Sequence, residues 1–153
     1  MSFWDSLRIG SSALSAQRLR LDLISNNIAN AETTRTAGGG AYKRQDVVFT
    51  TQGQKSFLPT LMLANRKQNP ISASDAGLSG VTVANIVTDT QPGQRVYDPK
   101  HPDADKDGYV TYPNVDLVTE MTNMLSATRS YEANLAMIDS AKRMALQALN
   151  IGK

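Results

Sequence analysis

The C-terminal end of the chain is constrained most by what it lacks: residues 115–151 contain neither Gly nor Pro. Inside a helix a Pro costs about 3 kcal/mol and a Gly about 1 kcal/mol, so this stretch is free to form one continuous helix. About 36 residues at ~1.5 Å each span roughly 54 Å. A compact chain of 153 residues has a diameter of only about 40 Å. We therefore expect the helix to project from the domain and to act in oligomerisation.

The apolar residues of this stretch follow the alternating four-three spacing of a coiled-coil seam. Asn114 is expected to be the N-cap, and Asp116 and Glu120 suit the positive end of the helix dipole. A second apolar series near the C-terminus makes the last turns apolar around most of their circumference, which indicates burial on several sides. The seam comprises Leu117, Met121, Met124, Thr128, Tyr131, Leu135, Ile138, Lys142, Ala145 and Leu149, and the second series Met137, Ala141, Met144, Ala148 and Ile151.

The N-terminal residues 5–30 predict a second long helix. Two apolar series repeat every seven residues and are offset by two residues, which is about 200° around a helix. One face can pack within the chain, and the other still needs covering. The alternative is a free helical hairpin whose extra apolar residues are ordinary surface exposure. The first series is Leu7, Leu14, Leu21 and Ile28, and the second is Ile9, Ala16 and Leu23.

The middle of the chain holds the helix breakers, since all six prolines and eight of the ten glycines lie between Gly38 and Pro113. This distribution predicts a small β-rich insert after a flexible joint at the three glycines 38–40. Residues 51–79 show no clear pattern and are expected to form a loop. The expected strands cover residues 42–49, 80–88, 95–97 and 109–112, with a turn at Pro92–Gly93.

Composition excludes several functional classes. The chain has no cysteine, which excludes a disulfide scaffold, a thiolate zinc site and a thiol nucleophile. A net charge of +2 without a basic run argues against a nucleic-acid surface. No apolar run approaches the roughly 18 residues of a membrane span. Asp5 stands where a secretory signal is basic, so any export is expected to proceed without a cleaved signal.

Candidate chemistry is sparse. His101 lies between prolines and no nucleophile elbow accompanies it, so no catalytic residue is expected. The glycines 38–40 lack the Lys-Ser/Thr of a phosphate loop, and no cofactor is expected. The acidic run from Asp103 to Gly108 matches the opening of a calcium loop, but Asn114 occupies the position of the bidentate Glu. We interpret the run as a turn into the following strand and expect no metal ligand.

Two alternatives from other classes remain open. One is a calcium-binding interaction module that uses the acidic turn at residues 103–108. The other is a membrane-surface helix that uses Arg8, Arg18 and Arg20, although Asp5 and Asp22 weaken this interpretation.

Three segments carry a resemblance to a known family. Residues 25–33 (SNNIANAET) are similar to the signature of the axial proteins of the bacterial flagellum, which form its rod and hook. Residues 115–121 (VDLVTEM) and 130–134 (SYEAN) resemble the paired C-terminal signature. Residues 96–110 narrow the resemblance to proximal rod subunits, with another rod or hook subunit as the alternative. The signature residues singled out are Asn27, Asn30, Thr33, Asn114, Glu120, Tyr131 and Asn134.

The resemblance implies an α+β fold in which the N- and C-terminal helices pair antiparallel as a coiled coil around a small β-rich insert. The implied regions are 1–34 and 114–153 for the rod core and 35–113 for the insert. The residues expected in subunit packing are Leu7, Leu14, Leu21, Ile28, Ile9, Leu23, Leu117, Met121, Met124, Tyr131, Leu135, Ile138, Met144 and Leu149.

The same resemblance implies a function. The chain would be a non-enzymatic subunit of the proximal rod that transmits torque from the membrane ring to the distal rod and hook. The implied partners are copies of itself, rod subunits of the FlgB, FlgF and FlgG types, the rod-to-ring adaptor FliE, membrane-ring proteins and the flagellar type III export apparatus. The implied location is the periplasmic rod of the basal body. Neither nucleic acid nor direct membrane insertion is implied.

Overall fold

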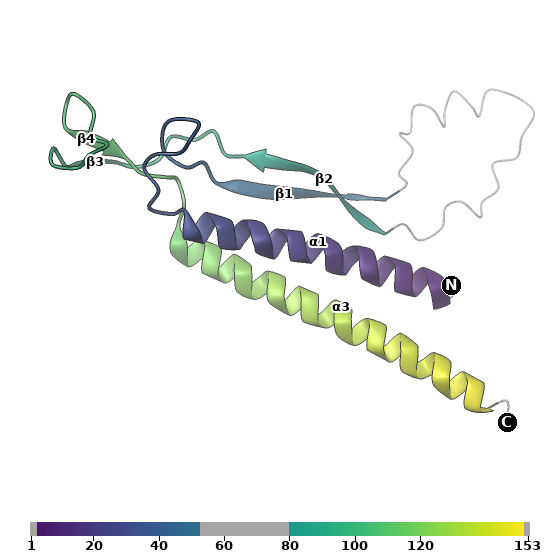
Figure 1. Cartoon of the computed structure of the whole chain (residues 1–153). Helices are drawn as coiled ribbons and strands as arrows, with labels where there is room; N and C mark the ends of the chain where they lie inside the picture. The colour runs from purple at the N-terminus through teal and green to yellow at the C-terminus, as the bar shows by residue number, and fades with distance from the viewer. Residues whose placement is uncertain (1–2, 53–79, 152–153) are drawn as a thin grey trace, which may run out of the picture.

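A computed structural model describes residues 3–52 and 80–151 (Figure 1). Two long helices enclose, in sequence, a small β-rich insert of two separate two-stranded sheets. This is the α+β fold expected from the sequence. Residues 53–79 of the predicted loop lie outside the described residues. The elements are α1 (Phe3–Ala29), β1 (Gln45–Thr51), β2 (Val81–Thr88), β3 (Arg95–Tyr97), β4 (Tyr109–Thr111) and α3 (Leu117–Ile151).

The two helices run antiparallel, and two contacts define their register. Near the end of α1, Asn27 contacts Glu120 in the first turns of α3. Closer to the start of α1, a Cβ placed on Gly10 would lie only 2.7 Å from Cγ1 of Ile138. The absence of a side chain at Gly10 therefore allows the close approach there. The C-terminal turns of α3 continue past the start of α1, and the two helices diverge at that end (Figure 1).

Helix α1 lies between α3 and the ribbon formed by β1 and β2 (Figure 1). The backbone N–H of Val81 donates a hydrogen bond to Ser12 Oγ at 3.1 Å. Ile9 and Ala16 are three and four residues from Ser12 and therefore share its side of the helix. The second apolar series of α1 thus faces the ribbon of its own chain. The expectation that an outside neighbour must cover this face is wrong, because the insert covers it.

The strands pair as antiparallel ribbons. β1 and β2 run from Gln45 opposite Thr88 to Thr51 opposite Val81, with a bulge between Val48 and Phe49. β3 and β4 form the shorter pair. The first strand begins three residues later than predicted because the N–H of Tyr42 bonds the carbonyl of Thr33 in the loop after α1, and not β2.

The start of α3 also differs from the prediction. The helix begins at Leu117, and Asp116 caps it by accepting hydrogen bonds from the Val118 N–H at 3.1 Å and the Thr119 hydroxyl at 2.6 Å. These bonds from Thr119 and Val118 lower the pKa of the Asp116 carboxyl. Asn114 is therefore not the N-cap. Its amide instead donates to Asp89 Oδ2 at 3.1 Å and ties the approach to α3 to the loop after β2.

The apolar core is small for a chain of this length. Among the described residues, five apolar side chains are buried and sixteen large ones are exposed, nine of them on α3. Exposed apolar side chains gathered on one element mark an interaction surface. Neither helix of the described part is long and apolar enough to cross a membrane. The buried residues are Ala16, Leu23, Ile24, Val110 and Ala127.

Candidate assembly interface

A buried polar cluster joins the end of α1, the approach to β1 and the start of α3. Asn27 is 0% exposed, and all of its hydrogen-bonding capacity is used. Its Nδ2 donates to the Gln45 carbonyl at 2.8 Å and to Glu120 Oε2 at 3.3 Å. Its Oδ1 accepts from the Tyr42 hydroxyl at 2.9 Å and from the Gln45 N–H at 3.0 Å. We call Asn27, Tyr42, Arg44, Gln45 and Glu120 the Asn27–Glu120 cluster.

Glu120 carries the charge of this cluster and is only 1% exposed. Arg44 Nε donates to Glu120 Oε1 at 2.8 Å. Burial by itself lowers the pKa of Arg44, but the hydrogen bond and charge of Glu120, together with Asp46, raise it overall. Burial and the Glu120 charge also raise the pKa of the Tyr42 phenol, which stays protonated and donates to Asn27.

The cluster fixes how three segments meet. A buried polar side chain that loses its partner costs about 1–3 kcal/mol, and more when it is charged. Sliding α3 along α1 by one turn would separate Glu120 from Asn27 and leave both without these partners. With so few buried apolar residues, this polar contact is a principal determinant of the helix register.

The expected packing residues of α1 all lie toward the chain itself. Leu23 is buried, and the other five are half-buried. This helix therefore uses its apolar side chains mainly within the subunit. The half-buried residues are Leu7, Ile9, Leu14, Leu21 and Ile28.

The expected packing residues of α3 separate into two groups. Met124, Tyr131 and Ile138 are half-buried. The other five have exposed fractions between 45% and 73%, and among the described helices and strands α3 packs against α1 alone. These five are available to neighbours outside the chain: Leu117, Met121, Leu135, Met144 and Leu149.

The structure adds apolar residues that the seam analysis missed, among them Val118, Leu125 and Leu146, each more than half exposed. The predicted seam is rotated around the helix axis relative to the true inward side of α3, because that side includes polar residues. These are the buried Glu120 and the half-buried Asn134. Apolar periodicity does not register such positions. The seven-residue spacing of Val118 and Leu125 was the available signal.

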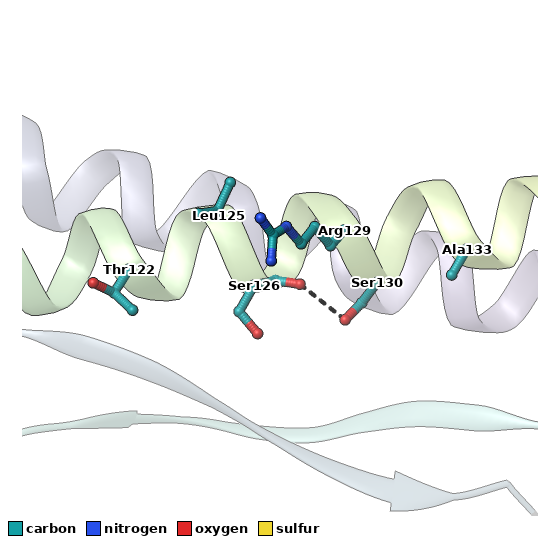
Figure 2. A pocket seen from close by; sticks show the side chains of 6 residues that line it. All are labelled: Thr122, Leu125, Ser126, Arg129, Ser130 and Ala133. Atoms are coloured by element: carbon teal, nitrogen blue, oxygen red, sulfur yellow. Dashed lines mark hydrogen bonds between the residues drawn. The ribbon is translucent and has the colours of Figure 1, made fainter.

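A shallow groove of about 400 Å³ lies on α3 beside these residues (Figure 2). All of its lining side chains come from α3. Three of them are small, and the Ser130 hydroxyl donates a 2.9 Å hydrogen bond to the Ser126 carbonyl, which keeps this side chain close to its own helix. Small residues on a helix surface let another backbone approach closely, as is known for helix pairs in membranes. The lining residues are Thr122, Leu125, Ser126, Arg129, Ser130 and Ala133.

The acidic turn after β3 has structural partners. Asp103 accepts a 2.7 Å hydrogen bond from Thr34 and lies 3.6 Å from Arg35, which ties the turn to the segment after α1. Asp105 pairs with Arg95 at 3.6 Å. His101 Nδ1 accepts from the Asp103 N–H at 3.1 Å. In residues 3–52 and 80–151 no group of three His, Cys, Asp or Glu side chains is placed to hold a metal ion.

The signature residues concentrate where the helices meet. Asn27 and Glu120 form the buried cluster, and half-buried Tyr131 and Asn134 follow on α3. Asn30 Nδ2 donates to the Asn26 carbonyl at 2.9 Å and satisfies a backbone group at the end of α1. The Thr33 hydroxyl donates to Asn30 Oδ1 at 3.2 Å.

Comparison with known proteins agrees with this geometry at both helices. The family model "Flagella basal body rod protein" matches residues 7–35, and "Flagellar basal body rod FlgEFG protein C-terminal" matches residues 106–151. The flagellar basal-body rod protein FlgC of Borreliella burgdorferi is 44% identical over 99% of this chain and 98% of its own. FlgC of Bacillus subtilis is 40% identical, and FlgC of Salmonella typhimurium 35%, each over the full length of both chains. The chain belongs to the FlgC family of flagellar basal-body rod proteins and is a structural subunit of the rod.

Proposed function

We propose that this rod subunit polymerises through its terminal helices and transmits torque from the membrane ring to the distal rod and hook. The observation that carries the proposal is the concentration of nine exposed large apolar side chains on α3, which packs against α1 alone among the described elements. Burying apolar surface contributes about 25 cal/mol per Å². A polymer that covers these side chains gains stability that the single subunit lacks.

The specific partners belong to the same proposal. Assembly with other rod subunits and with copies of itself follows from membership of the family. We assign FlgB-, FlgF- and FlgG-type subunits, FliE and membrane-ring proteins as its neighbours in the periplasm. Export proceeds through the flagellar type III apparatus without a cleaved signal. The β-rich insert, which includes the exposed aromatic pair Tyr97 and Tyr109, contributes to the choice of neighbour.

The proposed role is mechanical and includes no catalysis. The polar groups that the structure brings together connect segments of the chain: the Asn27–Glu120 cluster joins both helices to β1, and Asp103 joins the acidic turn to Thr34. Torque transmission requires such fixed connections between helices and insert.

Deletion of the gene in its own host, followed by complementation, tests the proposal. The deletion strain is expected not to swim, and mass spectrometry of isolated basal bodies from the complemented strain should find the protein in the rod fraction. A deletion strain that swims normally, or basal bodies that lack the protein, would overturn the proposal. Calorimetric titration with calcium tests the alternative function, a calcium-binding interaction module. A calcium affinity tighter than millimolar would favour that alternative over the rod subunit.

A further inference from the structure

The two helices each present a strip of exposed residues on the side turned away from the rest of the subunit. The α1 strip has the three-four spacing of one helix face and is polar, with small serines between charges. The α3 strip carries charges between apolar residues and borders the groove of Figure 2. The α1 strip is Trp4, Arg8, Ser11, Ser15, Arg18, Asp22, Ser25 and Ala29, and the α3 strip is Met121, Leu125, Arg129, Glu132, Ala136, Asp139, Arg143 and Leu146.

We propose that the α1 strip of one copy packs antiparallel on the α3 strip of a second copy. The inference rests on the proposed function, since it names the contact between adjacent copies in the rod. Within one subunit the two strips cannot meet because both point away from the α1–α3 contact. The contact is therefore heterologous, with different patches on the two partners, and it generates rings or helical filaments instead of closed dimers.

The direction of packing follows from the symmetry of such an assembly. Copies related by rotation about a common axis, or by a helical step along it, keep the same polarity along that axis. In each copy α3 runs opposite to α1. The α1 helix of a neighbour therefore runs opposite to the α3 helix on which it packs.

In this direction opposite charges face each other in the central part of the two strips. Along α1 the order is Arg8, Arg18, Asp22, and along the reversed α3 it is Arg143, Asp139, Glu132, Arg129. In the alignment Arg18 faces Glu132 and Asp22 faces Arg129, while Arg8 faces Arg143 and lies about one turn from Asp139. The residue numbers of the two opposite-charge pairs add to 150 and 151, so one register serves both. Arg8 lies 3.5 Å from Asp5 of its own helix, and this carboxylate offsets the like charge of Arg143.

The uncharged positions agree with the same register. Trp4, whose side chain is 74% exposed, falls opposite Leu146, which is 53% exposed. At the other end Ala29 falls opposite Met121, which is 60% exposed. Ser15 meets Ala136 between them, where small residues allow close approach.

The register also fixes the relative height of the copies. Inside a subunit the facing residues Gly10 and Ile138 have numbers that add to 148, and between copies the sums centre near 150. A difference of two residues corresponds to a shift of about 3 Å along the helix axis. Adjacent copies would therefore lie almost level, as side-by-side members of one turn of the rod.

Charge exchange in the full-length protein tests the contact inside the cell. Arg18→Glu and Glu132→Arg are each expected to reduce incorporation into basal bodies at least tenfold, because each places like charges opposite one another. The double variant should recover to within about threefold of the wild type. Co-expression of the two single variants should also restore incorporation in part, which only a contact between copies explains. Lys106→Glu, an exposed charge change outside both strips, is the matched control and should have no effect.

Cysteine cross-linking tests the register, because the chain has no cysteine of its own. Ser15→Cys with Ala136→Cys should give disulfide-linked dimers and longer ladders in isolated basal bodies. Ser25→Cys with Ala136→Cys uses the same strips about 16 Å out of register and should give at least tenfold less. Cross-linking within one chain, to a different rod protein, or equally in both pairs would overturn the inference.

These outcomes are separable from a failure of the proposed function. Normal assembly of both single charge variants, in cells whose wild-type protein is present in the rod and required for swimming, overturns the α1–α3 contact alone. Absence of the wild-type protein from basal bodies overturns the rod function itself. Export of each variant into the periplasm is measured in parallel, so that a secretion defect is not counted as an assembly defect.

Discussion

Helices α1 and α3 have similar sequence patterns, yet the structure surrounds them very differently. α1 has α3 on one side and the β1–β2 ribbon on another, whereas α3 has α1 as its one packing partner among the described elements. Between Trp4 and Ala29, which are exposed at its two ends, the apolar residues of α1 are accordingly buried or half-buried, while nine large apolar side chains of α3 remain exposed. An apolar helix face is stabilised by burial, and the small insert of the same chain buries such a face on α1 only.

The difference assigns separate roles to the two helices. The apolar surface of α1 mainly stabilises the subunit, and we propose that the apolar surface of α3 serves the polymer. The Asn27–Glu120 cluster connects the two roles, because it holds the start of α3 against the end of α1 and against the approach to the insert. Four sets of substitutions test this contrast.

The matched pair Leu21→Asp and Leu135→Asp should show the largest effect on assembly. Leu135 is 45% exposed, so its Asp variant should keep the stability of the isolated subunit and still abolish assembly, since a charge would enter the polymer contact. Leu21 is half-buried, so its Asp variant should destabilise the subunit itself by about 2 kcal/mol. Circular dichroism during urea unfolding and recovery from basal bodies measure the two effects. Equal losses of subunit stability would remove the distinction between the helices.

Glu120→Leu should cost the subunit about 3 kcal/mol, at the low end for breaking a buried ion pair because Arg44 remains 25% exposed to water. Glu132→Leu, on the exposed side of the same helix, is the control and should change the unfolding free energy by less than about 0.5 kcal/mol. Adding Arg44→Met to Glu120→Leu should recover part of the loss. Unchanged stability of the single variant would show that the cluster does not hold the helices together.

Gly10→Leu tests the contact of α1 with Ile138 of α3, which the missing side chain of Gly10 allows. A Cβ at this position meets Ile138 Cγ1 at 2.7 Å and Cδ1 at 2.9 Å, so a larger side chain must push the helices apart. We expect a loss of about 2 kcal/mol from overpacking. Gly10→Ala, which Ile138 can accommodate by a rotamer change, should lose much less in the same urea titration. A fully stable Leu variant would mean that the helices separate freely at this end.

Asp116→Ala should have the smallest effect, a modest fall in the thermal midpoint through loss of the N-cap of α3. The pKa of Asp116 is lowered in the folded chain, so its stabilising contribution is present at neutral pH and is lost as the pH falls below about 4. The difference between variant and wild type should therefore shrink in acid. Asn114→Ala serves as the comparison, and an equal effect at Asn114 that does not change with pH would contradict the assignment of the cap.

Several features could be predicted from the sequence because they depend on local chemistry. Backbone geometry alone predicts a long helix from the absence of Gly and Pro in residues 115–151. The same geometry predicts the insert from the helix breakers between Gly38 and Pro113. The residues 25–33 also marked the end of α1, which the structure places at Ala29. The N-cap was harder, since Asn114 and Asp116 are both good capping residues and only the bond of Asn114 to Asp89 removes it from the helix.

The sequence by itself determined two long apolar helices, a small β-rich insert between them, and more apolar surface than one chain of this composition can cover. Only the tertiary structure decided which face of each helix turns inward. The reason is physical, because apolar periodicity shows only how much of a helix surface avoids water. The inward face of α3 is instead fixed at Glu120, a charged residue. Its burial is stable only because Asn27 and Arg44, from distant segments of the chain, donate hydrogen bonds to it. The ribbon likewise packs on α1, where Ala16 and Leu23 are buried, and not on α3.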